Sequence, residues 1–234
     1  MSLVMHQSQN NSQETTDAST PDELTGLNGV TWAAWWNFQS LGTNDDVWTR
    51  WATGQQSWRM TNNNTGDKIH FYMDSTSNHA VFSGPGALST NTWYNIVIRF
   101  DGSVINQLKL ACWVNGVRVE QSTEVTVTGT IPGTIPSSNQ GISIGADSSG
   151  SAEGRCTVAE ATIWNTALSD QEAASLYLQP HTRVRLSNIF VHWPLFTANH
   201  RTDLIRNLVL ANQQANTPIY DENPNTIPED FLGA

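Results

Sequence analysis

Three tryptophans stand close together in a polar stretch of the chain and have the chemistry to bind sugars. Polar turn residues flank Trp48, Trp51 and Trp58, which favours exposure of their indole rings. Exposed aromatic rings stack on the apolar C–H faces of sugars, and Trp and Tyr are common anchors at interfaces. The alternative is packing between two curved sheets, which we expect for most of the ten tryptophans. We therefore predict Trp48, Trp51 and Trp58 as ligand-binding residues.

Residues suited to catalysis are not grouped in the sequence. Glycoside hydrolysis needs two carboxyl groups about 5 Å apart for retention, or further apart for inversion. Glu120 and Glu124 lie near a turn, and Glu160 stands alone in its apolar run. The six histidines are scattered, and no Gly-x-Ser-x-Gly sequence is present. We predict no catalytic residues and no enzymatic activity.

Composition and charge exclude several classes of partner. The 234 residues include 11 basic and 21 acidic side chains, for a net charge of −10. No cluster of basic residues is present to displace counterions from nucleic acid phosphates. The apolar runs fall far short of the ~20 residues that cross a bilayer. We predict neither nucleic acid nor membrane as a partner. For Cys112 and Cys156, in alternating apolar runs, we expect two buried free thiols, with a disulfide as the alternative.

Short alternating runs predict strands along most of the chain. Few residues are charged, while Thr, Ser, Asn and Gly are abundant, a composition that suits strands and turns. Trp32 and Trp36 share one face of the first clear strand, and Trp35 lies on the other. Asn115-Gly116 between two alternating runs is the strongest short-range signal for a hairpin, because a type I′ turn needs positive φ at both positions. The predicted strands are residues 30–38, 47–51, 57–60, 68–73, 93–100, 108–114, 117–120, 141–145, 156–164 and one within 184–195.

One helix is predicted near residues 169–178. Ser169-Asp170-Gln171-Glu172 forms a capping box, and Leu168 can pack against Ala173. Pro180 ends the apolar face, and we expect this short amphipathic helix to lie across a sheet edge. Many short strands with turns between them and one small helix indicate an antiparallel β-sandwich.

Three segments in order resemble the concanavalin A-like, laminin-G-type jelly-roll domain over roughly residues 25–180. The resemblance implies an all-β fold, an antiparallel two-sheet jelly-roll sandwich. The chain departs from the family pattern at Cys156, where many members have Gly. It departs again at His192-Trp193-Pro194-Leu195, because a Trp-Pro-Leu strand often opens such a domain. We predict that segment 184–195 adds a permuted strand beside the N-terminal one. The matching segments are Asn91 to Ser103 (NTWYNIVIRFDGS), Trp113 to Val117 (WVNGV), and Ile142 to Gly145 (ISIG) followed by Val158 to Ser169 (VAEATIWNTALS) and Glu172.

The resemblance also suggests a cofactor and argues against hydrolysis. Laminin-G-type relatives often hold one Ca²⁺ through carboxylates and carbonyls at a loop rim. Asp45, Asp46 and Asp147 are the loop acids that could serve, with solvated turn residues as the alternative. Jelly-roll glucanases carry Glu-x-Asp-x-x-Glu on one strand, and this sequence contains no such run.

These observations predict an N-terminal polar arm (1–24), a laminin-G-like sandwich (25–196) and a C-terminal extension (197–234). The plain Met start without an export signal and the polar ends predict a non-catalytic structural or attachment protein of a bacteriophage particle. So does the resemblance of the 159–169 segment and the late Trp-Pro-Leu strand to phage-encoded members. Such a protein would be a capsid decoration or tail-associated subunit, assembled in the host cytoplasm and located in the virion. Its partners would be other virion subunits, copies of itself and host-surface glycans. The alternatives are a lectin, Ca²⁺-dependent or built on aromatic side chains, and, third, a glycan hydrolase.

Overall fold

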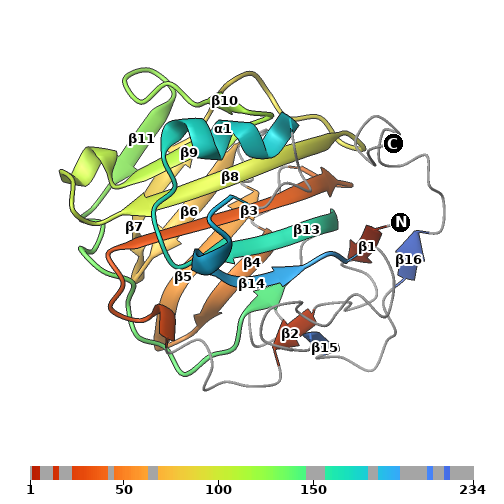
Figure 1. Cartoon of the computed structure of the whole chain (residues 1–234), viewed down its shortest axis with the longest axis horizontal. Helices are drawn as coiled ribbons and strands as arrows, with labels where there is room; N and C mark the ends of the chain where they lie inside the picture. Colours follow the sequence, from red (N-terminus) through yellow and green to blue (C-terminus); the bar gives the residue numbers. More distant parts are fainter. Residues whose placement is uncertain are drawn as a thin grey trace.

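The computed structural model describes residues 2–5, 13–15, 23–41, 45–62, 68–145, 156–178, 184–195, 210–212 and 219–221. Their strands form two antiparallel sheets that pack face to face, and one α-helix lies outside the first sheet (Figure 1). This arrangement confirms the predicted all-β, jelly-roll-type sandwich with one short helix in the described part of the chain.

The first sheet is built around the long strand β3, which pairs with β8 on one side and β13 on the other. Helix α1 (Asp170–Leu178) follows β13, and two 3₁₀ turns span Asn106–Leu108 and Leu186–Asn188. The strand order is β10 (Val117–Arg118), β9 (Leu110–Val114), β8 (Trp93–Asp101), β3 (Gly29–Phe38), β13 (Cys156–Trp164), β1 (Ser2–Met5) and β16 (Ile219–Asp221), with β14 (Ile189–Trp193) also paired to β13.

The second sheet is a meander of neighbouring strands extended by pieces from distant parts of the chain. Strands β4 to β7 pair in chain order, and β11 and β12 add to the two sides of that group. The order is β11 (Val125–Thr128), β7 (Ser75–Phe82), β6 (Ile69–Met73), β5 (Gln55–Asn62), β4 (Asp45–Ala52), β12 (Ser143–Ile144), β2 (Gln13–Thr15) and β15 (Leu210–Asn212).

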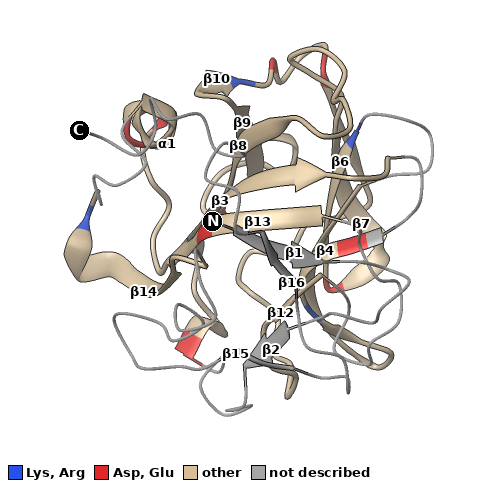
Figure 2. Cartoon of the chain, turned by 90° about the vertical axis from the view of Figure 1, so that its right-hand side faces the viewer, with Lys and Arg blue, Asp and Glu red and all other residues tan. Residues whose placement is uncertain are grey.

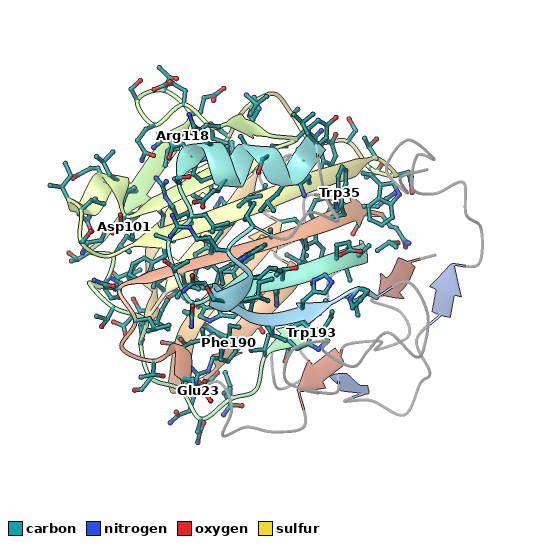
Figure 3. The ribbon with its side chains drawn as sticks, in the orientation of Figure 1. Glu23, Trp35, Asp101, Arg118, Phe190 and Trp193 are labelled. Carbon is teal, nitrogen blue, oxygen red and sulfur yellow. The ribbon has the colours of Figure 1, made fainter. Side chains whose placement is uncertain are left out.

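The main core fills the space between the sheets and is rich in aromatic rings. Trp32 and Trp36 of β3 belong to this core, and Trp35 faces the opposite way, as the alternation predicts. Trp32 packs against Trp58 and Phe71 from the second sheet, with ring centroids 5.1 and 4.8 Å apart. Phe190 and Trp193 of β14, labelled in Figure 3, are buried in the same core. At about 25 cal/mol per Å² of apolar surface, these side chains dominate the burial that stabilises the sandwich.

The hairpin and the helix cap follow the sequence signals closely. Asn115 and Gly116 have φ values of 51° and 75° and join β9 to β10, as a type I′ turn requires. At the helix start, the backbone N–H of Glu172 donates to Ser169 Oγ (3.3 Å), and that of Ser169 donates to Glu172 Oε2 (2.8 Å). The capping box is therefore confirmed.

The helix packs on the face of the first sheet rather than across an edge. Leu168, Ala173 and Leu176 join a second core cluster with Trp113 and Trp164 from the sheet. The expected edge position was wrong because the outer face of the sheet is apolar at this place. The apolar residues of the helix are buried against that face.

The late segment 184–195 is part of the first sheet. Strand β14 pairs with β13 from Ala161↔Trp193 to Trp164↔Ile189, so β13 lies between β14 and β3. The segment thus pairs with β13, whereas the sequence predicted a place beside the N-terminal strand, which is β3. The backbone of the described ends is also paired, β1 with β13 and β16 with β1. The predicted boundaries of arm, sandwich and extension remain predictions.

The remaining expectations concern thiols, charge and membranes. Cys112 and Cys156 are buried free thiols, as predicted. The basic residues that Figure 2 shows in blue lie apart from one another and form no patch in that view. No helix among the described residues combines the length and apolar character needed to span a membrane.

Candidate functional site

The outer face of the second sheet carries a cluster of polar and aromatic side chains. In β5 and β6, Trp58, Met60 and Phe71 point into the core, so the residues between them must point away from it. We call this outer surface the polar face. Its members are Asp46, Arg59, Thr61, His70, Tyr72 and His79.

Strand register places three of these residues in one row across neighbouring strands. Arg59 of β5 is paired with Tyr72 of β6, and Tyr72 is paired with His79 of β7. A second row runs from Asp46 through Thr61 to His70. Directly opposed residues in such rows lie close enough for their side chains to interact. The polar face is thus positioned by ordinary sheet pairing.

The Arg59 guanidinium lies over two aromatic rings. Its Cζ lies 4.9 Å from the ring centroid of Trp51 and 4.5 Å from that of Tyr72. Its Nη1 is 3.6 Å from Oδ1 of the fully buried Asp46, an ion pair longer than a hydrogen bond. Its Nε is buried and has no hydrogen-bond acceptor. The two rings and Asp46 therefore hold the guanidinium in position.

The two histidines of the polar face stay neutral at pH 7. Burial, the neighbouring His79 and the cations Lys68 and Arg59 lower the pKa of His70 to about 4. Burial is also the main cause that lowers the pKa of His79. The rings are stacked with centroids 5.7 Å apart, and His70 Nδ1 lies 3.1 Å from the Tyr72 hydroxyl. Neutral imidazoles both donate and accept hydrogen bonds, which suits hydroxyl-bearing ligands.

Solvent reaches one side of the polar face more than the other. Asp46 and Thr61, toward β4, are buried, whereas Tyr72, His79 and Arg59 are partly exposed. Burial raises the pKa of Tyr72, and the adjacent Arg59 opposes that rise, so its hydroxyl is protonated at neutral pH. A ligand could therefore touch an aromatic ring, a cation and a neutral imidazole side by side.

The predicted tryptophan platform is not exposed. Trp48, Trp51 and Trp58 are 2%, 4% and 0% exposed, so the expectation of accessible rings was wrong. Trp48 and Trp58 lie in the main core, and Trp51 is covered by the Arg59 guanidinium. Short polar turns do flank these residues, but the strands between the turns alternate, and two of the rings take inward positions. Of the three, Trp51 is the one that contacts residues of the polar face, Arg59 and Tyr72.

The predicted calcium ligands do not form a loop site in the described residues. Asp45 and Asp46 begin strand β4 instead of lying in a loop, and Asp46 is fully buried beside Arg59. Asp147 lies outside the described residues. Within the described ranges, no three His, Cys, Asp or Glu side chains gather as a metal site.

Sequence reasoning missed the residues that define the polar face. Arg59, His70, Tyr72 and His79 are not among the residues that the sequence predicts as ligand-binding. Their signal is the alternation itself, since polar residues at 59, 70 and 72 interrupt apolar runs at every second position. The order of the strands in the sheet brings these residues together, and the alternation does not predict that order.

A second polar cluster joins β13 to β14. Thr162 Oγ1 lies 2.7 Å from His192 Nδ1, and His192 Nε2 lies 3.3 Å from Glu160 Oε2. Glu160 has φ of 54° at an irregularity in the pairing of β13 with β3. Thr162 and His192 are 5% and 3% exposed, so a substrate has little access to this chain of groups.

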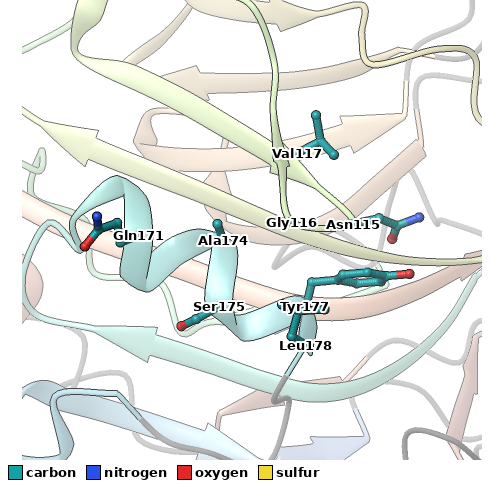
Figure 4. Close-up of a pocket in the computed structure, with 8 residues that line it drawn as sticks. All are labelled: Asn115, Gly116, Val117, Gln171, Ala174, Ser175, Tyr177 and Leu178. Carbon is teal, nitrogen blue, oxygen red and sulfur yellow. The ribbon is translucent and has the colours of Figure 1, made fainter.

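A shallow groove of about 510 Å³ lies between helix α1 and the β9–β10 turn (Figure 4). Val117 and Leu178 on its walls are 55% and 77% exposed, and its lining has no charged side chain. Its polar side chains are the uncharged Asn115, Gln171, Ser175 and Tyr177. The lining residues are Asn115, Gly116, Val117, Gln171, Ala174, Ser175, Tyr177 and Leu178.

Solved structures resemble this fold at low sequence identity. A proposed carbohydrate binding protein from Bacteroides ovatus aligns over 93% of this chain and 60% of its own, with TM-score 0.59 and 15% identity. A pentraxin from Limulus polyphemus aligns over 75% and 81%, with TM-score 0.53 and 13% identity. The NanB sialidase of Streptococcus pneumoniae aligns over 74% and 27%, with TM-score 0.54 and 17% identity. These similarities establish the fold alone.

The sequence itself matches a family model. No curated protein matches the chain. The model of the concanavalin A-like lectin/glucanases superfamily matches residues 11–174, well over half of the chain. That range contains the residues of the polar face and most strands of both sheets. The chain belongs to the concanavalin A-like lectin/glucanase superfamily.

Proposed function

We propose that the protein is a non-catalytic carbohydrate-binding module whose ligand lies on the polar face. The observation that carries the proposal is the row of Arg59, Tyr72 and His79 across three adjacent strands. The solved relative from Bacteroides ovatus, a proposed carbohydrate binding protein, supports it at the level of fold.

The chemistry of the row suits a sugar. A pyranose ring offers apolar C–H patches and a rim of hydroxyl groups, so it needs an aromatic surface beside donors and acceptors. Tyr72 supplies a partly exposed aromatic side chain, one face of which lies against Arg59. Neutral His79 can both donate and accept hydrogen bonds. Arg59 supplies charged N–H donors, whose hydrogen bonds are stronger than neutral ones.

The arrangement of acids supports binding without hydrolysis. Both classes of glycosidase place two carboxyl groups around the scissile bond. On the described part of the polar face, the carboxylate beside the row is Asp46, which is fully buried and paired with Arg59. A carboxylate in that position cannot reach a glycosidic oxygen on the open side of the sheet.

A polysaccharide array, probed with calcium and then with chelator, tests this function. We expect selective binding that chelation leaves intact, because the row needs no metal. Tyr72→Ala should reduce binding at least about tenfold, since stacked aromatic anchors contribute about 1.4 kcal/mol or more. Tyr177→Ala, which removes a partly exposed tyrosine of helix α1, is the matched control and should bind normally.

Four results would count against the proposal. Absence of binding across a broad array would remove the function, and equal binding by Tyr72→Ala and the wild type would move the ligand elsewhere. Turnover of a bound polysaccharide would show an enzyme. Binding lost on chelation would return attention to the calcium ligands predicted at Asp45, Asp46 and Asp147.

A role in a bacteriophage particle is a second proposal, which the first can accompany. It rests on the resemblance of Glu160-Ala161-Thr162-Ile163-Trp164 and the residues after it to phage-encoded members, and on the Trp-Pro-Leu strand. In this proposal the chain is a capsid decoration or tail-associated subunit that contacts its copies and other virion proteins. Deleting residues 1–20 or 217–234 should abolish incorporation into particles, and a folded deletion variant that still incorporates would contradict the role.

A further inference from the structure

We propose, as a refinement that rests on the carbohydrate-binding function, that the glycan carries a carboxylate and that Arg59 binds it. The sugar class would then be an acidic one, such as a hexuronate or a sialate.

Arg59 differs from the fully buried arginine of the same sheet. Arg50 directs its guanidinium at three acceptors, the carbonyls of Gln140 and Ser138 and the hydroxyl of Thr25. The N–H donors of Arg50 therefore bind acceptors within the protein. Arg59, by contrast, has the Tyr72 hydroxyl as a hydrogen-bond partner and a carboxylate at the longer distance of 3.6 Å from Nη1. Its side chain is 21% exposed, so a ligand can approach it.

The planar guanidinium presents a fork of N–H donors that matches the two oxygens of a carboxylate. Trp51 and Tyr72 hold that fork on their ring faces, at 4.9 and 4.5 Å from Cζ. A side chain fixed in this way loses little rotamer freedom when it binds, which favours affinity. A neutral sugar hydroxyl would satisfy at most part of the fork.

The local balance of charge favours an anion even though the whole chain carries −10. The charged groups that act on His70 are the cations Lys68 and Arg59. Asp46 is the one carboxylate that acts on Tyr72. Among the charged groups that act on His70 and Tyr72, the cations Lys68 and Arg59 therefore outnumber the buried Asp46. The carboxylate of an acidic sugar would add a second negative charge beside them.

The test compares matched pairs of ligands with and without the carboxylate, by calorimetry on the full chain. Oligogalacturonate is paired with its carboxyl-reduced form, and sialyllactose with lactose. We expect the carboxylate form of at least one pair to bind about 10- to 100-fold tighter, as hydrogen bonds to charged groups allow. A sulfated oligosaccharide serves as a third anion without the planar carboxylate geometry, and should bind more weakly.

Two variants and a control locate the effect. Arg59→Lys keeps the charge but loses the fork, and should lose most of the preference for the carboxylate form. Arg59→Gln should lose all of it. Arg118→Gln is the matched control, because Arg118 is a partly exposed arginine that lies over Trp113 on the first sheet. The ligand comparison on the wild type needs no variant to fold.

The outcomes separate this inference from the function on which it rests. Equal binding of acidic and neutral partners, or a preference that survives Arg59→Gln, would overturn the inference and leave a carbohydrate-binding module in place. Tighter binding of the sulfated sugar would show that the site binds anions in general and would also overturn the inference. If no sugar of any kind binds, both proposals fail.

Discussion

At the level of single residues, the buried contact between Thr162, His192 and Glu160 ties two distant strands together. The groups lie within hydrogen-bond or ion-pair distance and belong to β13 and β14, which pair over only a few residues. A buried polar group that loses its partner costs about 1–3 kcal/mol. This contact therefore fixes how the late strand joins the sheet.

Thr162→Val tests that contact. The substitution keeps a β-branched side chain suited to a strand but removes the hydroxyl that lies 2.7 Å from His192 Nδ1. We expect the free energy of unfolding to fall by about 1–2 kcal/mol in urea denaturation. Thr126→Val, at an exposed position of β11, should change it by less than about 0.5 kcal/mol. Equal losses of unfolding free energy at both positions would show that the buried hydroxyl contributes no more to stability than an exposed one.

His70 makes stability depend on pH in a defined window. Its pKa is about 4 in the folded chain and 6.5 when exposed, so the unfolded state takes up the proton first as the pH falls. Stability should thus drop from pH 6.5 to about 4 and level off below, while above 6.5 both states are neutral. Because one pKa unit corresponds to about 1.4 kcal/mol and solvent screens a partly open site, we expect a loss of about 1–2 kcal/mol.

The difference between wild type and His70→Gln isolates this effect from all other titrating groups. The variant should be less stable at pH 7, because it loses the 3.1 Å contact with the Tyr72 hydroxyl. Its stability should fall less steeply between pH 6.5 and 4, as followed by chemical denaturation at several pH values. Parallel curves for the two proteins would place the titration elsewhere.

At the level of elements, the β9–β10 turn and helix α1 support one another. Gly116 has φ of 75°, and a Cβ built on it would lie 3.0 Å from the carbonyl oxygen of Ala174 and 3.1 Å from Cβ of Tyr177. The turn thus needs glycine both for its backbone and for the approach of the helix.

Gly116→Ala should lower the free energy of unfolding by about 2–3 kcal/mol, the sum of a strained φ and a tight contact. Gly54→Ala is the matched control, because Gly54 has φ of 78° but nothing within 4 Å of its Cβ position. It should cost about 1 kcal/mol. Thermal unfolding of both variants measures the difference in their stability. Equal losses of stability would mean that helix α1 moves away from the added methyl group at no cost.

Local signals predicted elements well and neighbours poorly. The Asn115-Gly116 turn and the Ser169–Glu172 capping box are short-range chemistry, and both are confirmed. The position of helix α1 and the strand that β14 joins depend on which surfaces remain open after the sheets form. The hydrophobic periodicity of one segment does not indicate which surfaces remain open or which strands become neighbours.

The site was hard to predict for the same reason. Arg59, Tyr72 and His79 come from three strands and meet through register, so no short motif contains them. The tryptophans were more conspicuous in the sequence, but a large apolar ring on an alternating strand is most often turned inward. For Trp48 and Trp58 that tendency outweighed the polar turns on either side.

At the level of the whole molecule, the two thiols report on the integrity of the core. Cys112 and Cys156 belong to different strands of the first sheet and are both fully buried. Burial raises the pKa of the Cys112 thiol far above its usual range, which suppresses the reactive thiolate. A colorimetric thiol reagent should therefore label neither cysteine in the native protein and both after denaturation. Rapid labelling of the native protein would show that the sheets open locally.

The position of β3 between β8 and β13 has a consequence for how the chain reaches its fold. Thr31 donates a hydrogen bond to the carbonyl of Thr166, 135 positions further along the chain. Such high contact order slows folding toward the millisecond-to-second range, because long loops must close before their contacts stabilise anything. During synthesis, one edge of the tryptophan-rich strand β3 stays unpaired until β13 has left the ribosome. A nascent chain halted before residue 156 would carry an open, apolar strand edge, the kind of surface that chaperones shield and that otherwise aggregates.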